Sequence, residues 1–425
     1  MVKKEVTLAI ASLLPGWTVA QQIGHAIPEK HPKLITYRCT ERGGCVQRDT
    51  AVVLDGFYRN IHEVNDTSVS CGTWAGLNTS LCTAAGACAK NCAVEGVDYA
   101  ANGVQTNGDA LMMNQFVKAP NGTYLSAGPR AYLLDVGGKD YELFKLLNME
   151  ITFDVDVSKL VCGMNGALYL TEMEASGGRS RTLNPAGAAY GTGYCDAQCP
   201  KLAWINGVAN PNLTHGACCN EMDLLESNAL VEDMTPHACN ISGVYLCTGD
   251  DECDQATGVC DEYGCGWNPY VYNVTEFYGP GRNYTINTQR KFTVVTQFIT
   301  DDGTSSGSLI EIRRLYVQGG RVNRNAAITV DGITTSVMDD AYCNATASWF
   351  QQRGGLADMG EALGRGMVLV FSIWDDTGGY MNWLDSGGAG PCNATEGNPA
   401  LIVKEHPDTK VIYSKIRYGE IGSTF

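Results

Sequence analysis

The stretch Asn220-Glu221-Met222-Asp223-Leu224-Leu225-Glu226 places three carboxylates within six residues, directly after the cysteine pair 218–219. In a regular strand Glu221 and Asp223 share one face, whereas Glu226 points to the other. In a helix Glu221 and Glu226 would lie about 140° apart. Both glutamates can reach one ligand only if the strand bulges or bends between them, and bulges are common beside active sites. We therefore expect a bulged β-strand here.

Such crowding of carboxylates suits hydrolysis of a glycosidic bond, which needs one carboxyl group ionised and another protonated at the same pH. Neighbouring negative charges raise the pKa of whichever group is less well hydrogen-bonded. The alternative is an acidic turn in which Met222, Leu224 and Leu225 are ordinary core residues. The spacing alone leaves both interpretations open.

Six further motifs surround this run in the chain. They are Gly193–Pro200 (GYCDAQCP), Gly264–Tyr270 (GCGWNPY), Tyr278–Gly281 (YGPG), Gly366–Asp376 (GMVLVFSIWDD), Met381–Ser386 (MNWLDS) and Gly419–Thr424 (GEIGST). Together with the acidic run they resemble the fungal family 7 glycoside hydrolases, which comprise cellobiohydrolases and endo-β-1,4-glucanases. The resemblance extends from about Gln21 to the C-terminus.

Residues 1–20 are expected to be a secretory signal peptide. Lys3 and Lys4 precede a short apolar stretch at 6–14, and Thr18-Val19-Ala20 is typical of a cleavage site. A buried N-terminal helix is the alternative. The stretch is too short to span a bilayer, and no later segment approaches the ~20 apolar residues required. We therefore expect a secreted, extracellular protein that begins at Gln21 and is not bound to a membrane.

The chain is strongly acidic. Its formal charge of −16 becomes −17 once Lys3, Lys4 and Glu5 are removed. Such acidity disfavours nucleic acid and anionic membranes as partners and is compatible with a neutral polysaccharide. The chain has no internal repeat, no low-complexity stretch and no Pro/Ser/Thr linker. We expect a monomer with one catalytic domain, residues 21–425, and no carbohydrate-binding module.

The periodicity of the chain indicates strands. Phe153, Val155 and Val157 alternate with polar residues, and three stretches are rich in β-branched and aromatic residues: 292–298, 309–317 and 411–418. Asp376–Gly379 predicts a turn between strands at 367–375 and 381–385, and a helix is expected at 356–363, ended by Gly364.

Many short strands and 49 glycines favour an all-β fold of two antiparallel sheets packed face to face. The resemblance implies a concanavalin-like β-jelly-roll sandwich with long disulfide-tied loops. One of its sheets is then expected to form an open substrate cleft.

The cysteines number 18, an even count. Cys195 and Cys199 with the pair 218–219 could in principle hold a structural zinc ion. Export to an oxidising compartment instead favours disulfides, so we expect neither a metal nor another cofactor. Spacing does not determine the pairing. The resemblance implies Cys39–Cys45, Cys71–Cys92, Cys82–Cys88, Cys162–Cys392, Cys195–Cys219, Cys199–Cys218, Cys239–Cys260, Cys247–Cys253 and Cys265–Cys343.

The chain also contains nine Asn-x-Ser/Thr sequons, which are candidate glycosylation sites on surface loops. They begin at Asn65, Asn78, Asn121, Asn212, Asn240, Asn273, Asn283, Asn344 and Asn393.

The resemblance also implies roles for individual residues. Glu221 is the expected nucleophile, Glu226 the general acid/base, and Asp223 the hydrogen-bond partner of the nucleophile. His237 matches a position beside the acid/base, although a lone histidine is more often a core residue. The expected substrate-binding residues are Tyr58, Asn165, Tyr169, Tyr194, Asp196, Gln198, Trp374 and Trp383. The two tryptophans match stacking platforms on either side of the cleaved bond, although a tryptophan in a strand is more often core.

Three departures from the exo-acting relatives favour endo action. Asn60 stands where those relatives have a tunnel-entrance tryptophan, the connection 384–391 is short, and 251–258, around Gln255, lacks an arginine. We therefore predict a retaining endo-1,4-β-glucanase (a cellulase) that hydrolyses cellulose and related β-1,4-glucans by double displacement. A cellobiohydrolase is the alternative.

A lectin-like protein that binds glucan without cutting it is a more remote alternative, because the same sandwich serves lectins. A lectin has no need of three clustered carboxylates. The sequence does not distinguish cellulose, mixed-linkage glucan and xylan as substrates.

Overall fold

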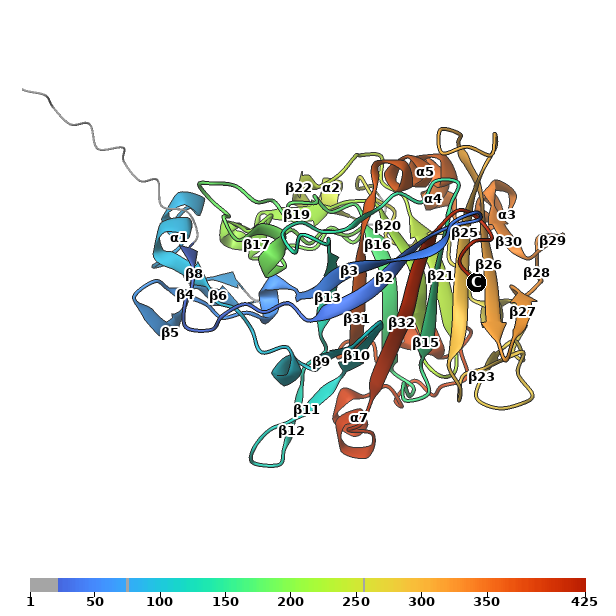
Figure 1. Ribbon diagram of the computed structural model, residues 1–425, viewed down its shortest axis with the longest axis horizontal. Coiled ribbons are helices and arrows are strands. Elements are labelled where there is room, and N and C mark those ends of the chain that lie inside the picture. The colour runs from blue at the N-terminus through green and yellow to red at the C-terminus, as the bar shows by residue number, and fades with distance from the viewer. Residues whose placement is uncertain (1–21, 74–75, 255–256) are drawn as a thin grey trace, which may run out of the picture.

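The computed structural model of the protein describes residues 22–73, 76–254 and 257–425. The expected signal peptide, Gln21 and Gln255 lie outside these residues. Figure 1 shows a β-rich body and a smaller lobe containing α1 (Ala85–Asn91) and β4 (Ile61–Glu63). The long strands β2 (Lys33–Thr40) and β3 (Gly44–Leu54) run from the body toward this lobe.

One continuous hydrogen-bonded sheet forms the body. Its neighbouring strands are, in order, β21 (Glu232–His237), β20 (Glu221–Ser227), β16 (Met164–Thr171), β31 (Met367–Asp375), β13 (Arg130–Leu134), β3, β2, β32 (Lys410–Gly419), β15 (Glu150–Asp156), β25 (Phe292–Thr300), β26 (Leu309–Gln318) and β27 (Arg321–Arg324). The pairing of β2 with β32 is parallel, and the other pairings along this path are antiparallel.

The sheet turns back on itself, so that its two ends face each other across the main core. Figure 1 shows β32, β15, β25 and β26 as one layer, with β16 and β20 behind it. Leu168 and Leu170 of β16 pack in the same buried cluster as Phe298 of β25 and Ile312 of β26. The all-β fold of two facing layers with disulfide-tied loops is therefore confirmed.

Side chains alternate between two faces along the strands in the middle of the sheet. In β31, Leu369 and Phe371 enter the main core, whereas Val368 and Val370 belong to a second cluster on the opposite face. This is the two-residue period of a strand that is buried on both sides. We call the face of β21, β20, β16 and β31 that points away from the main core the site face.

The strands expected from alternation are all present. The stretches around 153, 292–298, 309–317 and 411–418 lie in β15, β25, β26 and β32 respectively. The apolar residues of these stretches supply much of the main core, because each strand turns one face toward it.

The helix expected at 356–363 is present as α5 (Gly355–Arg365), with Leu356, Met359 and Leu363 fully buried on one side. The predicted end at Gly364 is wrong. The helix continues to Arg365, and Gly366 caps it because its φ of 111° is accessible to glycine. Neither α5 nor any other helix in the described part of the chain is long and apolar enough to cross a membrane.

The prediction of a hairpin at 367–385 is also wrong for its second strand. A turn does follow β31, with the Asp376 carboxylate accepting from the backbone N–H groups of Gly378 and Gly379. Residues 382–385 then form a short helix, α6 (Asn382–Asp385), because Tyr380 and Met381 adopt left-handed backbone angles that redirect the chain.

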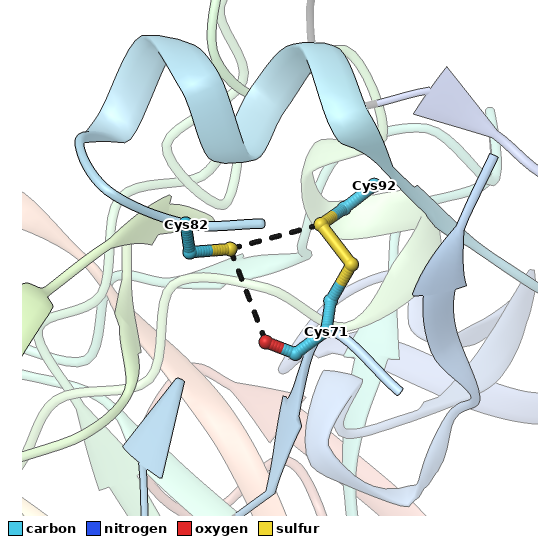
Figure 2. A group of neighbouring side chains, drawn as sticks. All are labelled: Cys71, Cys82 and Cys92. Atoms are coloured by element: carbon cyan, nitrogen blue, oxygen red, sulfur yellow. Dashed lines mark hydrogen bonds between the residues drawn. A yellow bond between two sulfur atoms is a disulfide. The ribbon is translucent and has the colours of Figure 1, made fainter. Parts of the chain in front are cut away.

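All 18 cysteines form disulfides, and the nine pairs are those that the resemblance implies. Figure 2 shows the Cys71–Cys92 bridge beside Cys82, whose Sγ lies 3.7 Å from that of Cys92 and 3.9 Å from the Cys71 carbonyl oxygen. Cys82 is itself bonded to Cys88. A sulfur atom in a disulfide lacks the thiolate charge that zinc binds. The disulfide-bonded cysteines therefore cross-link loops.

Candidate active site

A bulge interrupts the β20 strand in the middle of the acidic run. Against β16, Asp223 pairs with Tyr169 and Leu225 pairs with Leu168, which leaves Leu224 as an extra residue. The register with β21 shifts at the same place. Leu224 and Leu225 both enter the main core, and Glu226 returns to the site face with Glu221 and Asp223. The bulge predicted from the spacing is confirmed.

The Glu221 carboxylate is covered by the loop that carries Asp196. The backbone N–H of Ala197 donates to Glu221 Oε2 at 3.1 Å. The disulfides Cys195–Cys219 and Cys199–Cys218 hold both sides of this loop against the start of β20. Glu221 is only 4% exposed. The two disulfides therefore fix the donor that stabilises the anionic form of Glu221.

His237 contacts Asp223 and the backbone of Asp261. His237 Nδ1 lies 2.9 Å from the Asp261 carbonyl oxygen, which can only accept, so Nδ1 carries a hydrogen. Nε2 lies 3.0 Å from Asp223 Oδ2. The two side chains form an ion pair when His237 is protonated.

One donor atom each from Glu221, Asp223 and His237 lies within 4.8 Å of the others. The spacing of these three side chains is therefore also compatible with a metal ion.

Glu226 lies on the same strand as Asp223, beyond the bulge, and is half-buried. Asn165 of β16 donates from Nδ2 to Glu226 Oε1 at 2.8 Å, and its Oδ1 accepts from the Ser227 backbone at 3.1 Å. The amide is thereby fixed in one orientation, and Oε2 of Glu226 is left to carry a proton. Asp233 is the cross-strand partner of Glu226 on β21.

Burial shifts the titration of the whole carboxyl cluster. It raises the pKa of Glu226 well above its usual value, the charges of Asp223 and Asp233 raise it further, and the Asn165 hydrogen bond opposes them. Burial likewise raises the pKa of Glu221, with Asp223 and Asp196 adding to the rise and His237 and the Ala197 N–H opposing it. Such shifts keep protons on buried carboxyls at a pH where exposed ones are ionised.

Tyrosines and an arginine close one side of the site face. Tyr169 of β16 and Tyr194 form a hydroxyl–hydroxyl contact of 3.0 Å, and both are 6% exposed. The guanidinium of Arg130 stacks 3.4 Å from the centre of the Tyr194 ring and pairs with Asp55 at 2.7 Å. The structure therefore brings these two expected tyrosines to the site, where they are buried at its side and contact each other through their hydroxyl groups.

The two expected tryptophans lie together on the other side of Asn165. Trp374 pairs with Asn165 across β31 and β16, and its ring stacks on that of Trp383 at 6.4 Å with an interplanar angle of 27°. Trp374 is half-buried and Trp383, on α6, is 48% exposed. Neither is a core residue. Their apolar faces are suitable for stacking against a sugar ring.

Two expected residues occupy less direct positions. Tyr58 is half-buried, packs against the main core and donates to the Gly128 carbonyl oxygen. Gln198 has an exposed side chain, and its backbone N–H donates to Asp196 Oδ1. Asp196 itself is buried, close enough to Glu221 to raise its pKa.

Asp233 and Arg130 are site residues that the sequence reasoning missed. Asp233 lies seven residues after Glu226, and a register for the β20–β21 hairpin would have placed it opposite that glutamate. No local pattern marks Arg130, because its neighbours Asp55 and Tyr194 are distant in the chain.

The chain belongs to glycosyl hydrolase family 7, which matches residues 23–425. It is 54% identical to a probable endo-β-1,4-glucanase of Aspergillus clavatus, over 100% of this chain and 99% of that protein. The solved structure of a Humicola insolens endocellulase is 46% identical, covers 95% of this chain and 100% of its own, and has a TM-score of 0.89. A Daphnia pulex family 7 cellobiohydrolase is 36% identical, with coverage of 95% and 100% and a TM-score of 0.87.

Proposed function

We propose that the protein is a secreted, monomeric, retaining endo-1,4-β-glucanase whose single catalytic domain spans residues 21–425. The observation that carries the proposal is the bulged strand that brings Glu221 and Glu226 to one face, with Asp223 on the same strand and His237 on the neighbouring one. The similarity to endoglucanases over the whole chain supports the same conclusion. The nine disulfides suit an oxidising extracellular compartment.

In the proposed first step Glu221 attacks the anomeric carbon while Glu226 protonates the departing glycosidic oxygen. Burial raises the pKa of both glutamates; the Ala197 N–H opposes the rise at Glu221, whereas the charges of Asp223 and Asp233 add to the rise at Glu226 and favour its protonated form. In the second step Glu226, now ionised, removes a proton from the water that hydrolyses the glycosyl-enzyme. Two inversions give net retention.

Asp223 is proposed to control the charge next to the nucleophile. Its Oδ2 lies 3.0 Å from His237 Nε2, so the Asp223 anion faces a positive charge whenever His237 is protonated. The charge of Asp223 raises the pKa of Glu221 and His237 lowers it, so these two side chains set the charge that the nucleophile faces. Asp223 and His237 therefore belong to the catalytic machinery in this proposal.

Endo action is supported by the surroundings of Trp383. Its 48% exposure means that the short connection 384–391 does not cover it. Asn60 is exposed, and its Nδ2 donates to the Thr67 carbonyl oxygen. An internal segment of a glucan chain could therefore approach the tryptophan pair from the side, without threading an end.

The product profile on soluble substituted cellulose tests the proposal. Viscosity of carboxymethylcellulose should fall much faster than reducing ends accumulate, and products up to about cellotetraose should appear early. Cellobiose as the dominant first product, with viscosity nearly constant, would establish a cellobiohydrolase instead. Binding without any hydrolysis would favour the lectin-like alternative.

A further inference from the structure

The bulge in β20 leaves one buried residue without a paired residue on either neighbouring strand. Leu224 is the extra residue, so neither register pairs it with a residue of β16 or β21. Leu224 and Leu225 are fully buried in the main core. A buried carbonyl without a donor costs about 1–3 kcal/mol, which favours a strand without the bulge.

Arg314, on the opposite layer, supplies a donor to this residue. It lies on β26 between Ile312 and Tyr316, whose side chains enter the same core, and it is only 1% exposed. Its Nη2 donates to the Leu224 carbonyl oxygen across the core. This hydrogen bond therefore joins β26, in the facing layer, to Leu224, which lies between the two glutamates.

The carboxyl group of Glu232 faces Arg314 next to the bulge, and burial raises the pKa of Glu232 to about 7 although Arg314 opposes the rise. Arg314 Nη1 lies 3.7 Å from Glu232 Oε2, and the Tyr316 hydroxyl donates to Glu232 Oε1. Glu232 is on β21, paired with Ser227, the residue after Glu226. A buried ion pair contributes little net stability compared with apolar residues of similar size. Its location at the bulge indicates a role in conformational specificity.

We propose that Arg314 is a positioning residue, which holds the β20 bulge through the Leu224 carbonyl and so keeps Glu226 on the same face as Glu221. This inference rests on the proposed glycosidase function. If the bulge closes, the pairing of β20 beyond it shifts by one residue, and every side chain after that point turns to the other face. Without the Arg314 donor, Glu226 then moves away from the leaving oxygen while Glu221 stays in place.

The test compares Arg314→Met with Arg313→Met on two aryl β-cellobiosides. Arg313 is on the same strand but faces outward and pairs with Glu311. With phenyl cellobioside, whose leaving group needs a proton, Arg314→Met should lower kcat/KM about 100-fold, since small displacements in an active site have effects of this size. With 2,4-dinitrophenyl cellobioside, which leaves without a proton, the loss should be much smaller. Arg313→Met should match the wild type on both substrates.

A purely structural role for Arg314 predicts equal losses on both substrates, and this result would overturn the inference, as would unchanged kinetics. If Arg314→Met does not fold, the double variant Arg314→Met/Glu232→Gln removes the uncompensated charge and should show the same dependence on the leaving group. Wild-type protein inactive on both substrates would instead refute the proposed function. Activity in the wild type with normal kinetics in both Arg314 variants refutes only the positioning role.

Discussion

Removing the Cys199–Cys218 disulfide should inactivate the protein at temperatures where its fold persists. This bridge closes a loop with a sequence separation of 19, nested inside the Cys195–Cys219 loop with a separation of 24. With the outer bridge intact, the inner one closes a ring of only seven residues, 195–199 with 218 and 219. The loop-entropy relation then gives about 2 kcal/mol for the inner bridge, against about 3 kcal/mol for an isolated loop of this separation.

The global effect of Cys199→Ala/Cys218→Ala is therefore small. Unfolding entropy is about 2.1 cal/mol/K per residue, so a loss of about 2 kcal/mol lowers the Tm of a chain this long by only about 2–3 °C. Activity should fall at a lower temperature, because the loop that carries the Ala197 N–H is released from Glu221 before the sheets separate. Circular dichroism and initial rates, followed over the same temperature range, measure the two events.

Cys82→Ala/Cys88→Ala is the matched control. This bridge has a sequence separation of 6 inside the Cys71–Cys92 loop, so it should have a similar effect on Tm. It lies in the small lobe, in a cluster separate from the site face. Activity of the control should follow its unfolding curve. If both variants lose activity at the same interval below their own Tm, the Cys199–Cys218 bridge acts only on global stability and the reasoning fails.

Three further predictions concern the carboxylates. Glu221→Gln should lower turnover by several orders of magnitude with oligosaccharide binding intact, and the wild type should release the β anomer first; NMR showing the α anomer would mean inversion. Glu226→Gln should lose about 10²–10⁴-fold on cellulose, the usual range for general acid–base catalysis, and recover partly on substrates with good leaving groups; equal losses on both would exclude the acid role. Burial, with the charges of Asp233 and Asp196, raises the pKa of Asp223 in the folded protein. The wild type therefore loses stability as the pH rises from the unfolded pKa toward the folded one, so Asp223→Asn should have a Tm that exceeds the wild-type Tm increasingly from about pH 4 upward. A difference in Tm that does not change with pH would contradict this.

Most expected site residues could be located from the chain alone because they cluster in short motifs. Glu221, Asp223 and Glu226 lie in one strand, and their spacing already required a bulge. Trp383 was also located by its motif, but the strand expected around it is a helix. Five residues from 381 to 385 are too few to separate a period of 2.0 from one of 3.6.

The sequence by itself determined the all-β class, the acidic strand with its bulge and, through the resemblance, the disulfide pairs. Local alternation and spacing carry that information, because they act between residues close in the chain. Only the tertiary structure decided that Asp233 faces Glu226, that Arg130 stacks on Tyr194 and that Arg314 reaches Leu224. Arg314 and Leu224 are 90 residues apart and come from facing layers. Their contact depends on the register of every strand between them, which no local pattern specifies.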